Sequence, residues 1–138
     1  MSRSSDDFLV VHVDDDQQLL ELSERFLTQE DDRLAIETTS DPVAAAERLR
    51  DGEYDAVVSD YQMPGLTGLE LLEDVRNAGR NDLPFIMFTG EGREEVASEA
   101  LNLGADRYLQ KGGDPASQYA VLADAVVHEI EHRSEERR

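Results

Sequence analysis

Short apolar runs alternate with amphipathic stretches along the whole chain. Three runs are apolar on nearly both faces, as parallel strands are when helices cover both sides of the sheet; they are Phe8–Val13, Asp55–Asp60 and Pro84–Thr89. Two further runs are weaker strand candidates, because Leu34–Thr39 alternates with polar residues and Asp106–Lys111 is mostly polar. We therefore expect a sheet in which the stronger runs are central and the two weaker runs lie at the edges.

Apolar residues at helical spacing fill the gaps between these runs. The first gap carries one such stripe at Leu19, Leu22 and Phe26. Asp41 followed by Pro42 predicts the start of the second helix, Gly104 predicts the end of the fourth, and the last helix is expected from Pro115 to Arg133. The repeated strand–helix pattern predicts an α/β fold, a (βα)5 doubly wound parallel sheet with strand order 2-1-3-4-5.

The length of 138 residues fits one domain. We place this domain at residues 8–133, with a disordered N-terminal tail at 1–7 and a charged tail or the start of a linker at 134–138. The sequence has no cysteine, which excludes disulfides and thiolate metal sites. No apolar run approaches the roughly 20 residues of a membrane span, and the start lacks the apolar core of a signal peptide, so we expect a soluble, cytoplasmic protein.

The charge balance is extreme, with 32 acidic residues against 13 basic residues and a net charge of −19. Duplex nucleic acid and anionic membranes are therefore poor partners for the domain. The acidity indicates either an acidic partner surface or adaptation to a very salty cytoplasm. We favour salt adaptation, because Lys111 is the only lysine and arginine supplies the other positive charges. This interpretation predicts a looser fold at low salt, where self-repulsion is poorly screened.

Polar side chains gather where the predicted strands end. Asp14, Asp15 and Asp16 follow the first strand, and Asp60, Thr89 and Lys111 end the third, fourth and fifth strands. In a doubly wound sheet these carboxyl ends face one crevice, so the side chains should meet. Converging carboxylates need a cation, and hard oxygen ligands suit Mg²⁺. With such an ion bound, one carboxylate can attack phosphorus while a lysine neutralises the transferring group.

Each residue also has a simpler explanation. The aspartates after the first strand would cap the first helix, Thr89 would cap the fourth, and Tyr108 would only pack at the edge. We interpret His12 as a strand histidine with satisfied hydrogen bonds rather than a ligand. Asp60 is harder to explain in this way, because a carboxylate that follows a buried strand is costly unless it is paired or coordinating.

The segments "VVHVDDD", "DAVVSDYQMPGLTGLELL", "PFIMFTGEG" and "GADRYLQK" together resemble the receiver domain of two-component response regulators. The resemblance runs from about Phe8 to Ile130 and implies a flavodoxin-like receiver fold. It implies that Asp60 accepts phosphate from a histidine kinase or phosphotransfer domain. Asp15 would bind Mg²⁺ (or Mn²⁺) directly, Asp14 mainly through water, and Gln62 through its backbone carbonyl.

The same resemblance implies a switch. Lys111 would contact the phosphoryl group and Asp60, Thr89 would move toward the phosphate, and Tyr108 would change rotamer. The surface of the fourth helix, fifth strand and fifth helix would then change. The chain would not be a conventional enzyme: it would catalyse its own Mg²⁺-dependent phosphorylation, from phosphohistidine or small phosphodonors, and its slow dephosphorylation. A phosphorylation-dependent homodimer and a downstream protein partner are further expectations.

The chain departs from the family at the loop after the lysine. The family usually has a cis proline there, whereas this chain has Gly112 and Gly113, for which we predict a trans or mobile connection. Gln62 and Glu91 occupy positions that tune dephosphorylation in the family. The ending "LQKGGDP…QYAVLA" resembles receivers fused to sensory and kinase modules in salt-loving archaea, which suggests a halophilic archaeal origin.

Three rival interpretations stay open at this point. A haloacid-dehalogenase-like phosphatase would use Asp14 and Asp16 but would leave Asp60 without a role. A flavodoxin-like cofactor binder would need a phosphate loop where this chain has aspartates that repel anions. A receiver-like module that binds partners without phosphorylation would not require the complete set of phosphorylation residues.

Overall fold

The computed structural model describes residues 7–136 of the chain. Its sheet has five parallel strands in the order β2-β1-β3-β4-β5, which confirms the predicted order. The strands are β1 (Phe8–Val13), β2 (Leu34–Thr39), β3 (Ala56–Ser59), β4 (Phe85–Thr89) and β5 (Arg107–Gln110). The weaker runs form the edges as predicted, and β3, β4 and β5 are slightly shorter than their predicted ranges.

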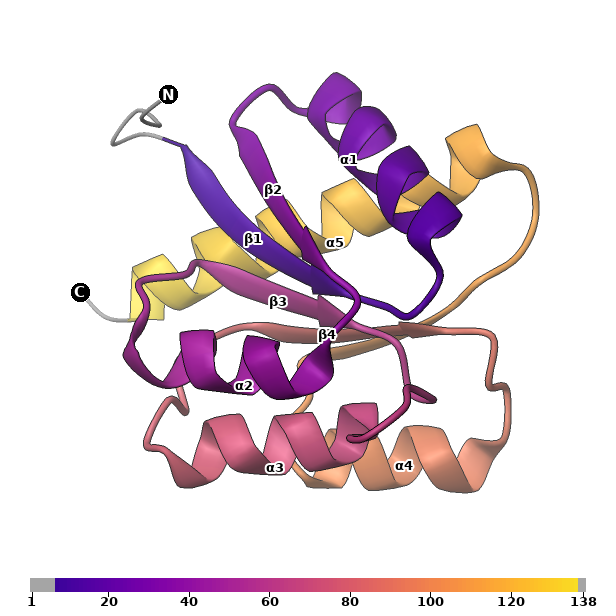
Figure 1. The fold of residues 1–138 in the computed structure, drawn as a ribbon. Helices are drawn as coiled ribbons and strands as arrows, with labels where there is room; N and C mark the ends of the chain where they lie inside the picture. The colour runs from indigo at the N-terminus through magenta and orange to yellow at the C-terminus, as the bar shows by residue number, and fades with distance from the viewer. Residues whose placement is uncertain (1–6, 137–138) are drawn as a thin grey trace.

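Helices cover both faces of the sheet (Figure 1). They are α1 (Gln17–Glu30), α2 (Pro42–Asp51), α3 (Gly68–Asn77), α4 (Glu94–Asn102) and α5 (Pro115–Glu136). α1 and α5 lie on one face, and α2, α3 and α4 lie on the other. α5 continues past Arg133, where the prediction ended it, and most of the predicted N-terminal tail lies outside the described residues.

Local signals fix where these helices begin and end. The side chain of Asp41 accepts hydrogen bonds from two backbone N–H groups of the first turn of α2, and Pro42 follows at the first helical position. Thr67 and Glu70 form a capping box at the start of α3. Gly104 lies just past the end of α4 with a φ of 110°, which is a conformation that favours glycine, as the sequence predicted.

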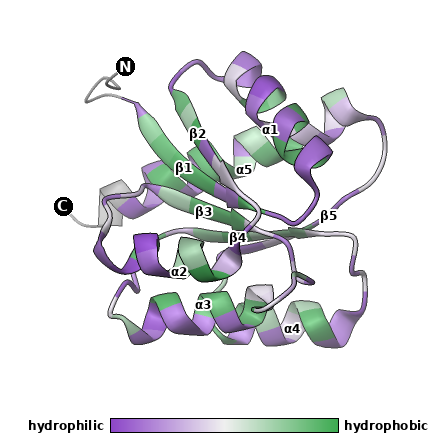
Figure 2. Ribbon diagram, in the orientation of Figure 1, coloured by the Kyte–Doolittle hydropathy of each residue, from purple (hydrophilic) through white to green (hydrophobic). Residues whose placement is uncertain are grey.

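The apolar side chains form one layer on each face of the sheet. Alternate residues of β1 serve the two layers, since Val11 packs with α2 and α3 while Val10 packs with α1 and α5. Figure 2 shows the same division, with hydrophobic strands between helices whose outer faces are hydrophilic. Within the described residues, no helix is both long enough and apolar enough to span a membrane.

The winding of the sheet reverses between β1 and β3. β1 pairs with β2 on one side and with β3 on the other, so the connections that follow these two strands run to opposite sides. A crevice opens beyond the carboxyl ends of strands at such a point. The residues that follow β1 and β3 therefore occupy the favoured ligand-binding position of the fold.

Candidate functional site

Three carboxylates meet beyond the carboxyl ends of β1 and β3. Asp14, Asp15 and Asp60 each offer an oxygen within 4.8 Å of the others. The strand register causes this meeting, because Val13 lies opposite Ser59 and the N–H of Asp60 donates to the carbonyl of Val13 at 3.0 Å. Asp14 and Asp60 are buried, whereas Asp15 is exposed.

Lys111 brings the only side-chain cation that the structure shows paired with these carboxylates. Its Nζ lies 2.8 Å from Asp14 Oδ2 and 3.3 Å from Asp60 Oδ2. The N–H of Lys111 donates to the carbonyl of Thr89 at 2.8 Å, which fixes the backbone beside the end of β4. We call Asp14, Asp15, Asp60 and Lys111 the carboxyl-edge cluster. With every group ionised, it carries more negative charge than its single ammonium neutralises.

Burial perturbs the ionisation of this cluster. It raises the pKa of Asp14, and the hydrogen bond and charge of Lys111 offset that rise only in part. Burial would lower the pKa of Lys111, but the adjacent Asp14 and Asp60 outweigh it, so the pKa of the ammonium is raised. Lys111 therefore stays charged near neutral pH, while burial disfavours the ionised form of the adjacent Asp14.

Asp60 is positioned by its own loop. Its Oδ1 accepts a hydrogen bond from the N–H of Tyr61 at 2.8 Å, and its Oδ2 faces Lys111. The start of α3 approaches closely, because a Cβ built on Gly68 would lie 2.2 Å from the carbonyl oxygen of Asp60. Only glycine allows this approach. The side chain of Asp60 keeps 12% of its surface exposed, so a reagent can reach it.

The donor set fits a hard divalent cation. Oxygen ligands at a partly exposed site suit Mg²⁺, which keeps several waters and few protein ligands. Asp15 is the exposed carboxylate of the cluster. Gln62, the remaining predicted ligand, lies exposed on the loop after Asp60, and its carbonyl stays a prediction.

Thr89 and Tyr108 are linked through one residue. The Thr89 hydroxyl is buried and accepts a hydrogen bond from the N–H of Glu91 at 3.2 Å. Tyr108 is half-buried, and its hydroxyl donates to the carbonyl of Glu91 at 2.6 Å. Arg93 holds the carboxylate of Glu91 through its Nε at 2.9 Å. Movement of Thr89 would therefore disturb Glu91, whose carbonyl also holds the Tyr108 hydroxyl.

The prediction that the hydrogen bonds of His12 are satisfied holds for only one of its two ring nitrogens. Nδ1 lies 2.6 Å from the hydroxyl of Ser23 on α1, but Nε2 is buried and has no hydrogen-bond partner among the described residues. Complete burial, with a smaller effect of the Lys111 charge, lowers the pKa of His12 to about 3. The ring is therefore neutral near pH 7. Sequence reasoning had no signal for Ser23, because a serine on a helix is an ordinary residue.

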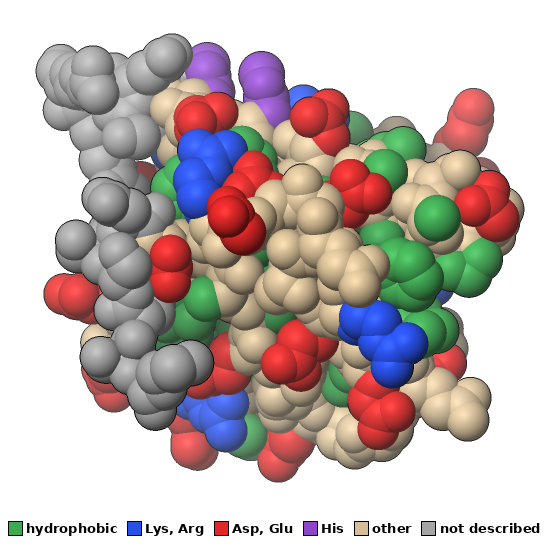
Figure 3. All heavy atoms as spheres, turned by 90° about the horizontal axis from the view of Figure 1, so that it is seen from above, with side chains coloured by type: hydrophobic (Ala, Val, Ile, Leu, Met, Phe, Trp, Pro, Cys, Tyr) green, Lys and Arg blue, Asp and Glu red, His purple; other side chains and the backbone are tan. Residues whose placement is uncertain are grey.

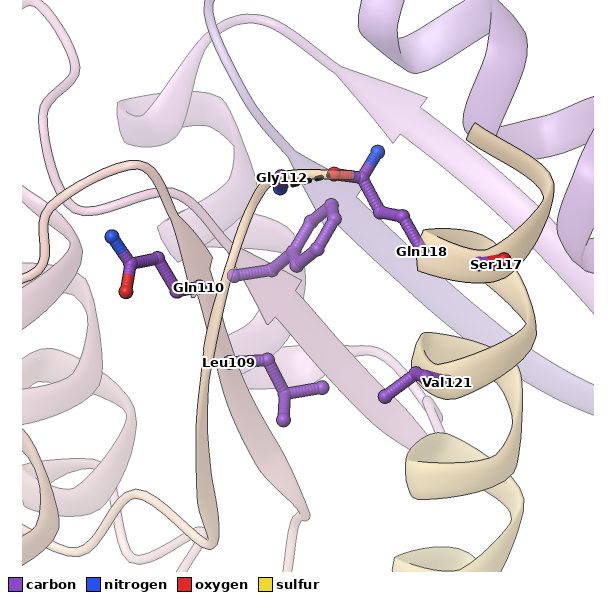
Figure 4. A pocket seen from close by; sticks show the side chains of 7 residues that line it. Leu109, Gln110, Gly112, Ser117, Gln118 and Val121 are labelled. Carbon is purple, nitrogen blue, oxygen red and sulfur yellow. Dashed lines mark hydrogen bonds between the residues drawn. The ribbon is translucent and has the colours of Figure 1, made fainter. Parts of the chain in front are cut away.

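The loop after Lys111 is anchored by α5. The described chain contains no cis peptide, so the connection is trans, in agreement with the prediction. The N–H of Gly112 donates to Oε1 of Gln118 at 2.7 Å, as the dashed line in Figure 4 shows. Gly112 and Gly113 have φ values of 153° and 77°, which favour glycine. The sequence did not single out Gln118, since the contact depends on how the loop folds back on the helix.

A second charged cluster lies at the opposite edge of the sheet. Asp106 precedes β5, accepts a hydrogen bond from the N–H of Phe85 at 2.9 Å, and forms ion pairs with Arg76 and Arg133. Arg76 also donates to three backbone carbonyls near the amino ends of β4 and β5. We call Arg76, Asp106 and Arg133 the amino-edge cluster. The sequence did not predict it, because these residues form no local motif.

The geometry disfavours the rival chemistries. Asp14 is completely buried and bound by Lys111, so it is not placed to attack a substrate as a phosphatase nucleophile. Asp16 caps α1 by accepting a hydrogen bond from the N–H of Leu19 at 3.2 Å. An anionic cofactor at this edge would meet the carboxylates of the carboxyl-edge cluster.

Comparison with known proteins gives a consistent picture. The family model described as "Response regulator receiver domain" matches residues 10–123. Transcriptional regulatory protein FixJ from Azorhizobium caulinodans is 33% identical over 131 residues, which cover 93% of this chain and 60% of FixJ. Chemotaxis protein CheY-3 from Vibrio cholerae is 36% identical over 72 residues, covering 51% of this chain and 55% of CheY-3. The chain therefore spans less than two thirds of either of these curated relatives.

Solved structures share the fold. A CheY-like receiver domain protein from Methanospirillum hungatei superposes with a TM-score of 0.82 at 24% identity, covering 94% of this chain and 98% of that structure. The signal receiver domain of a putative Luxo repressor protein from Vibrio parahaemolyticus gives a TM-score of 0.83 at 17% identity, covering 95% of both chains. At these identities the likeness concerns the fold alone.

Proposed function

The chain belongs to the response regulator receiver domain family of two-component systems, and on that premise we propose that Asp60 is its phosphoacceptor. One observation carries the proposal: the Asp60 carboxylate lies 3.3 Å from the Lys111 ammonium at a partly exposed edge where further carboxylates converge. The chemistry is phosphoryl transfer to a carboxylate from a histidine kinase or phosphotransfer domain. The rival interpretations lack an equally placed nucleophile.

The transfer follows from this placement. One carboxylate oxygen of Asp60 forms a bond to phosphorus as the bond from phosphorus to the donor histidine nitrogen breaks, and the imidazole keeps the electron pair. Lys111 neutralises charge on the phosphoryl oxygens. A bound Mg²⁺ (or Mn²⁺) would be held by Asp15, by Asp14 through water, and by the Gln62 carbonyl, and would offset the remaining negative charge.

The contacts around Glu91 suggest how the phosphoryl group would be sensed. We expect Thr89 to turn its hydroxyl toward a phosphoryl oxygen, which would end its contact with the N–H of Glu91. The carbonyl of the same residue accepts the hydrogen bond of Tyr108, so the populations of the Tyr108 rotamers would shift. The surface of α4, β5 and α5 would then present a different face to a partner, to a second copy of the chain, or to fused sensory and kinase modules.

The acidic surface supports a role in a very salty cytoplasm. Figure 3 shows acidic side chains spread across the viewed face and basic groups that lie beside acidic ones. With a net charge of −19, the protein has self-repulsion that dense salt would screen. We include halophilic adaptation in the proposal for that reason.

A phosphorylation assay tests the function. The protein is incubated with Mg²⁺ and a small acyl phosphate, its intact mass is measured, and the adduct is mapped by peptide analysis. We expect one phosphoryl group on Asp60, absent from Asp60→Asn and present in Asp74→Asn, an acidic control paired with Arg50 on the surface. An adduct on Asp14 with rapid turnover would support the phosphatase, and no adduct under any condition would support a module that only binds partners.

A further inference from the structure

α5 carries a motif that the receiver chemistry does not use. Residues 128–132 read His-Glu-Ile-Glu-His, which matches the H-E-x-x-H pattern in which two helical histidines bind zinc. Residues four apart on a helix lie on the same face, one turn above the other. The motif lies within α5, so the helical context that the pattern requires is present.

The two histidine rings lie close together on the same face of α5. The rings of His128 and His132 have centroids 6.1 Å apart and planes 5° from parallel. Both residues are exposed, and the remaining histidine, His12, is completely buried in the core. Figure 3 shows two histidine side chains next to each other at the surface. A solute ion can therefore reach both rings.

The separation of the rings suits one bridging ion. A metal bound to imidazole nitrogen lies about 2.0–2.1 Å from that nitrogen, hence roughly 3 Å from the ring centre. Two such rings reach one ion when their centres are roughly 6 Å apart or less, and the observed 6.1 Å is close to that limit. The ion must lie in the plane of each ring, so both side chains of this near-parallel pair turn about their χ angles to point a nitrogen at it.

The glutamate of the motif is not available for catalysis. Glu129 is 9% exposed, and its Oε2 accepts a hydrogen bond from Nε of Arg107 on β5 at 2.8 Å. In the zinc enzymes that use this motif, the glutamate acts as the general base beside the metal. Here it faces the sheet instead, so the histidines can bind an ion without the group that activates water.

We propose that His128 and His132 form a binding site for one divalent transition metal ion, of the class represented by Zn²⁺, Cu²⁺ and Ni²⁺, without peptidase activity. Imidazole suits these ions, whereas Mg²⁺ prefers the oxygen ligands of the carboxyl-edge cluster. Solvent completes the coordination. The chain would thus direct two classes of cation to two separate places, and the outcome does not depend on phosphorylation of Asp60.

The surroundings favour a cation on this face. Asp124 is exposed one turn before His128. A net charge of −19 also raises the local concentration of divalent ions around the molecule. These charges increase the rate and strength of capture, while the imidazoles supply the preference for transition metals.

Metal titration of the full chain without an affinity tag tests the site. Excess Mg²⁺ is present, Zn²⁺ binding is measured by calorimetry, and Cu²⁺ is used as a probe for imidazole nitrogen coupling in electron paramagnetic resonance. We expect one ion per chain and a copper spectrum with nitrogen ligands. His128→Ala and His132→Ala should each weaken binding by about tenfold or more, because each variant loses one of the two protein ligands.

Asp124→Asn is the matched control, because it removes a charge from the same face and leaves both imidazoles. It should weaken binding by no more than about fivefold, the scale of an exposed charge interaction. Circular dichroism checks that each variant is folded. The proposal is overturned by equal zinc affinity in the histidine variants, by a copper spectrum with oxygen ligands alone, or by half an ion per chain in a metal-linked dimer. Zinc-dependent cleavage of casein would overturn its non-catalytic part.

Discussion

The two charged clusters at opposite edges of the sheet differ in how completely their charges are paired. The carboxyl-edge cluster sets three carboxylates against one ammonium. In the amino-edge cluster, one carboxylate serves two guanidinium groups, which also donate to backbone carbonyls around it. Ion pairs and backbone hydrogen bonds there join the ends of α3, α5 and β5, whereas the excess negative charge at the carboxyl edge is left for a ligand to neutralise.

This difference indicates a way to separate structural charge from functional charge. Removing one partner from a paired, buried cluster should cost stability and leave the chemistry intact. Neutralising one carboxylate in a cluster with excess negative charge should preserve or raise stability and impair the chemistry. Four measurements test the distinction.

The largest effect is expected at the amino edge. Asp106→Asn leaves Arg76 and Arg133 without their shared carboxylate, and breaking a buried pair in this way costs about 3–5 kcal/mol of unfolding free energy. Urea unfolding measures the loss. The matched control is Asp74→Asn, whose exposed pair with Arg50 should contribute about 0–1 kcal/mol. Equal effects of the two substitutions would mean that the amino-edge cluster does not stabilise the fold.

Magnesium should stabilise through the carboxyl edge alone. An ion that binds only the folded state adds about 2.7 kcal/mol at a concentration of 100 times its Kd. Thermal or urea unfolding with and without Mg²⁺ measures the gain, and chelation should reverse it. Asp15→Asn should abolish most of the gain, while the Asp74→Asn control should keep it. A gain that persists in Asp15→Asn would place the ion elsewhere.

Acid should weaken the core behind the carboxyl edge. The pKa of His12 is lowered to about 3 in the fold. Between that value and its ordinary pKa of about 6.5, the unfolded chain binds a proton at His12 that the folded chain does not bind. His12 therefore contributes full stability above about pH 6.5 and loses it as the pH falls, by about 2 kcal/mol at pH 5. His12→Gln lacks this titration, so comparing unfolding of the two proteins from pH 7 to pH 5 isolates it. Parallel profiles would contradict the prediction.

The smallest effect should have the opposite sign to the first. Asp14→Asn removes a carboxylate whose burial raises its pKa, so the variant should gain about 1 kcal/mol at pH 7, the scale of a typical single substitution. The gain should shrink as the pH falls through that raised pKa, because the wild-type carboxyl then becomes neutral as well. Magnesium affinity should fall in the same variant. Destabilisation at pH 7 would show that the attraction between Lys111 and the Asp14 carboxylate outweighs the cost of burying that charge beside other carboxylates.

Much of this architecture could be predicted from the sequence, because it depends on local patterns. Apolar runs identified the strands, Asp41 and Pro42 marked a helix start, and the residues at the strand ends identified the carboxyl-edge cluster. Parallel topology makes that last inference safe, since all carboxyl ends share one edge.

The contacts that escaped prediction join residues far apart in an already folded chain. Asp106 and Arg133 are separated by 27 residues, and each is an ordinary charge in a highly charged sequence. His12 could be predicted to be buried, but the partner of each ring nitrogen depends on how α1 packs. The helical end of α5 past Arg133 is polar and offered no apolar period to extend the prediction.

The hydrogen bond from Gly112 to Gln118 gives Lys111 a mechanical link to α5. A proline after the lysine has no N–H, so this contact exists only because a residue other than proline stands there. Movement of the Lys111 ammonium at the carboxyl edge would reach the first turn of α5 through the backbone and this one hydrogen bond. Such a bond has a net strength of about 1 kcal/mol, a factor of about five in population. The loop therefore couples Lys111 to α5 only weakly, whereas a proline ring would hold the backbone after the lysine more rigidly.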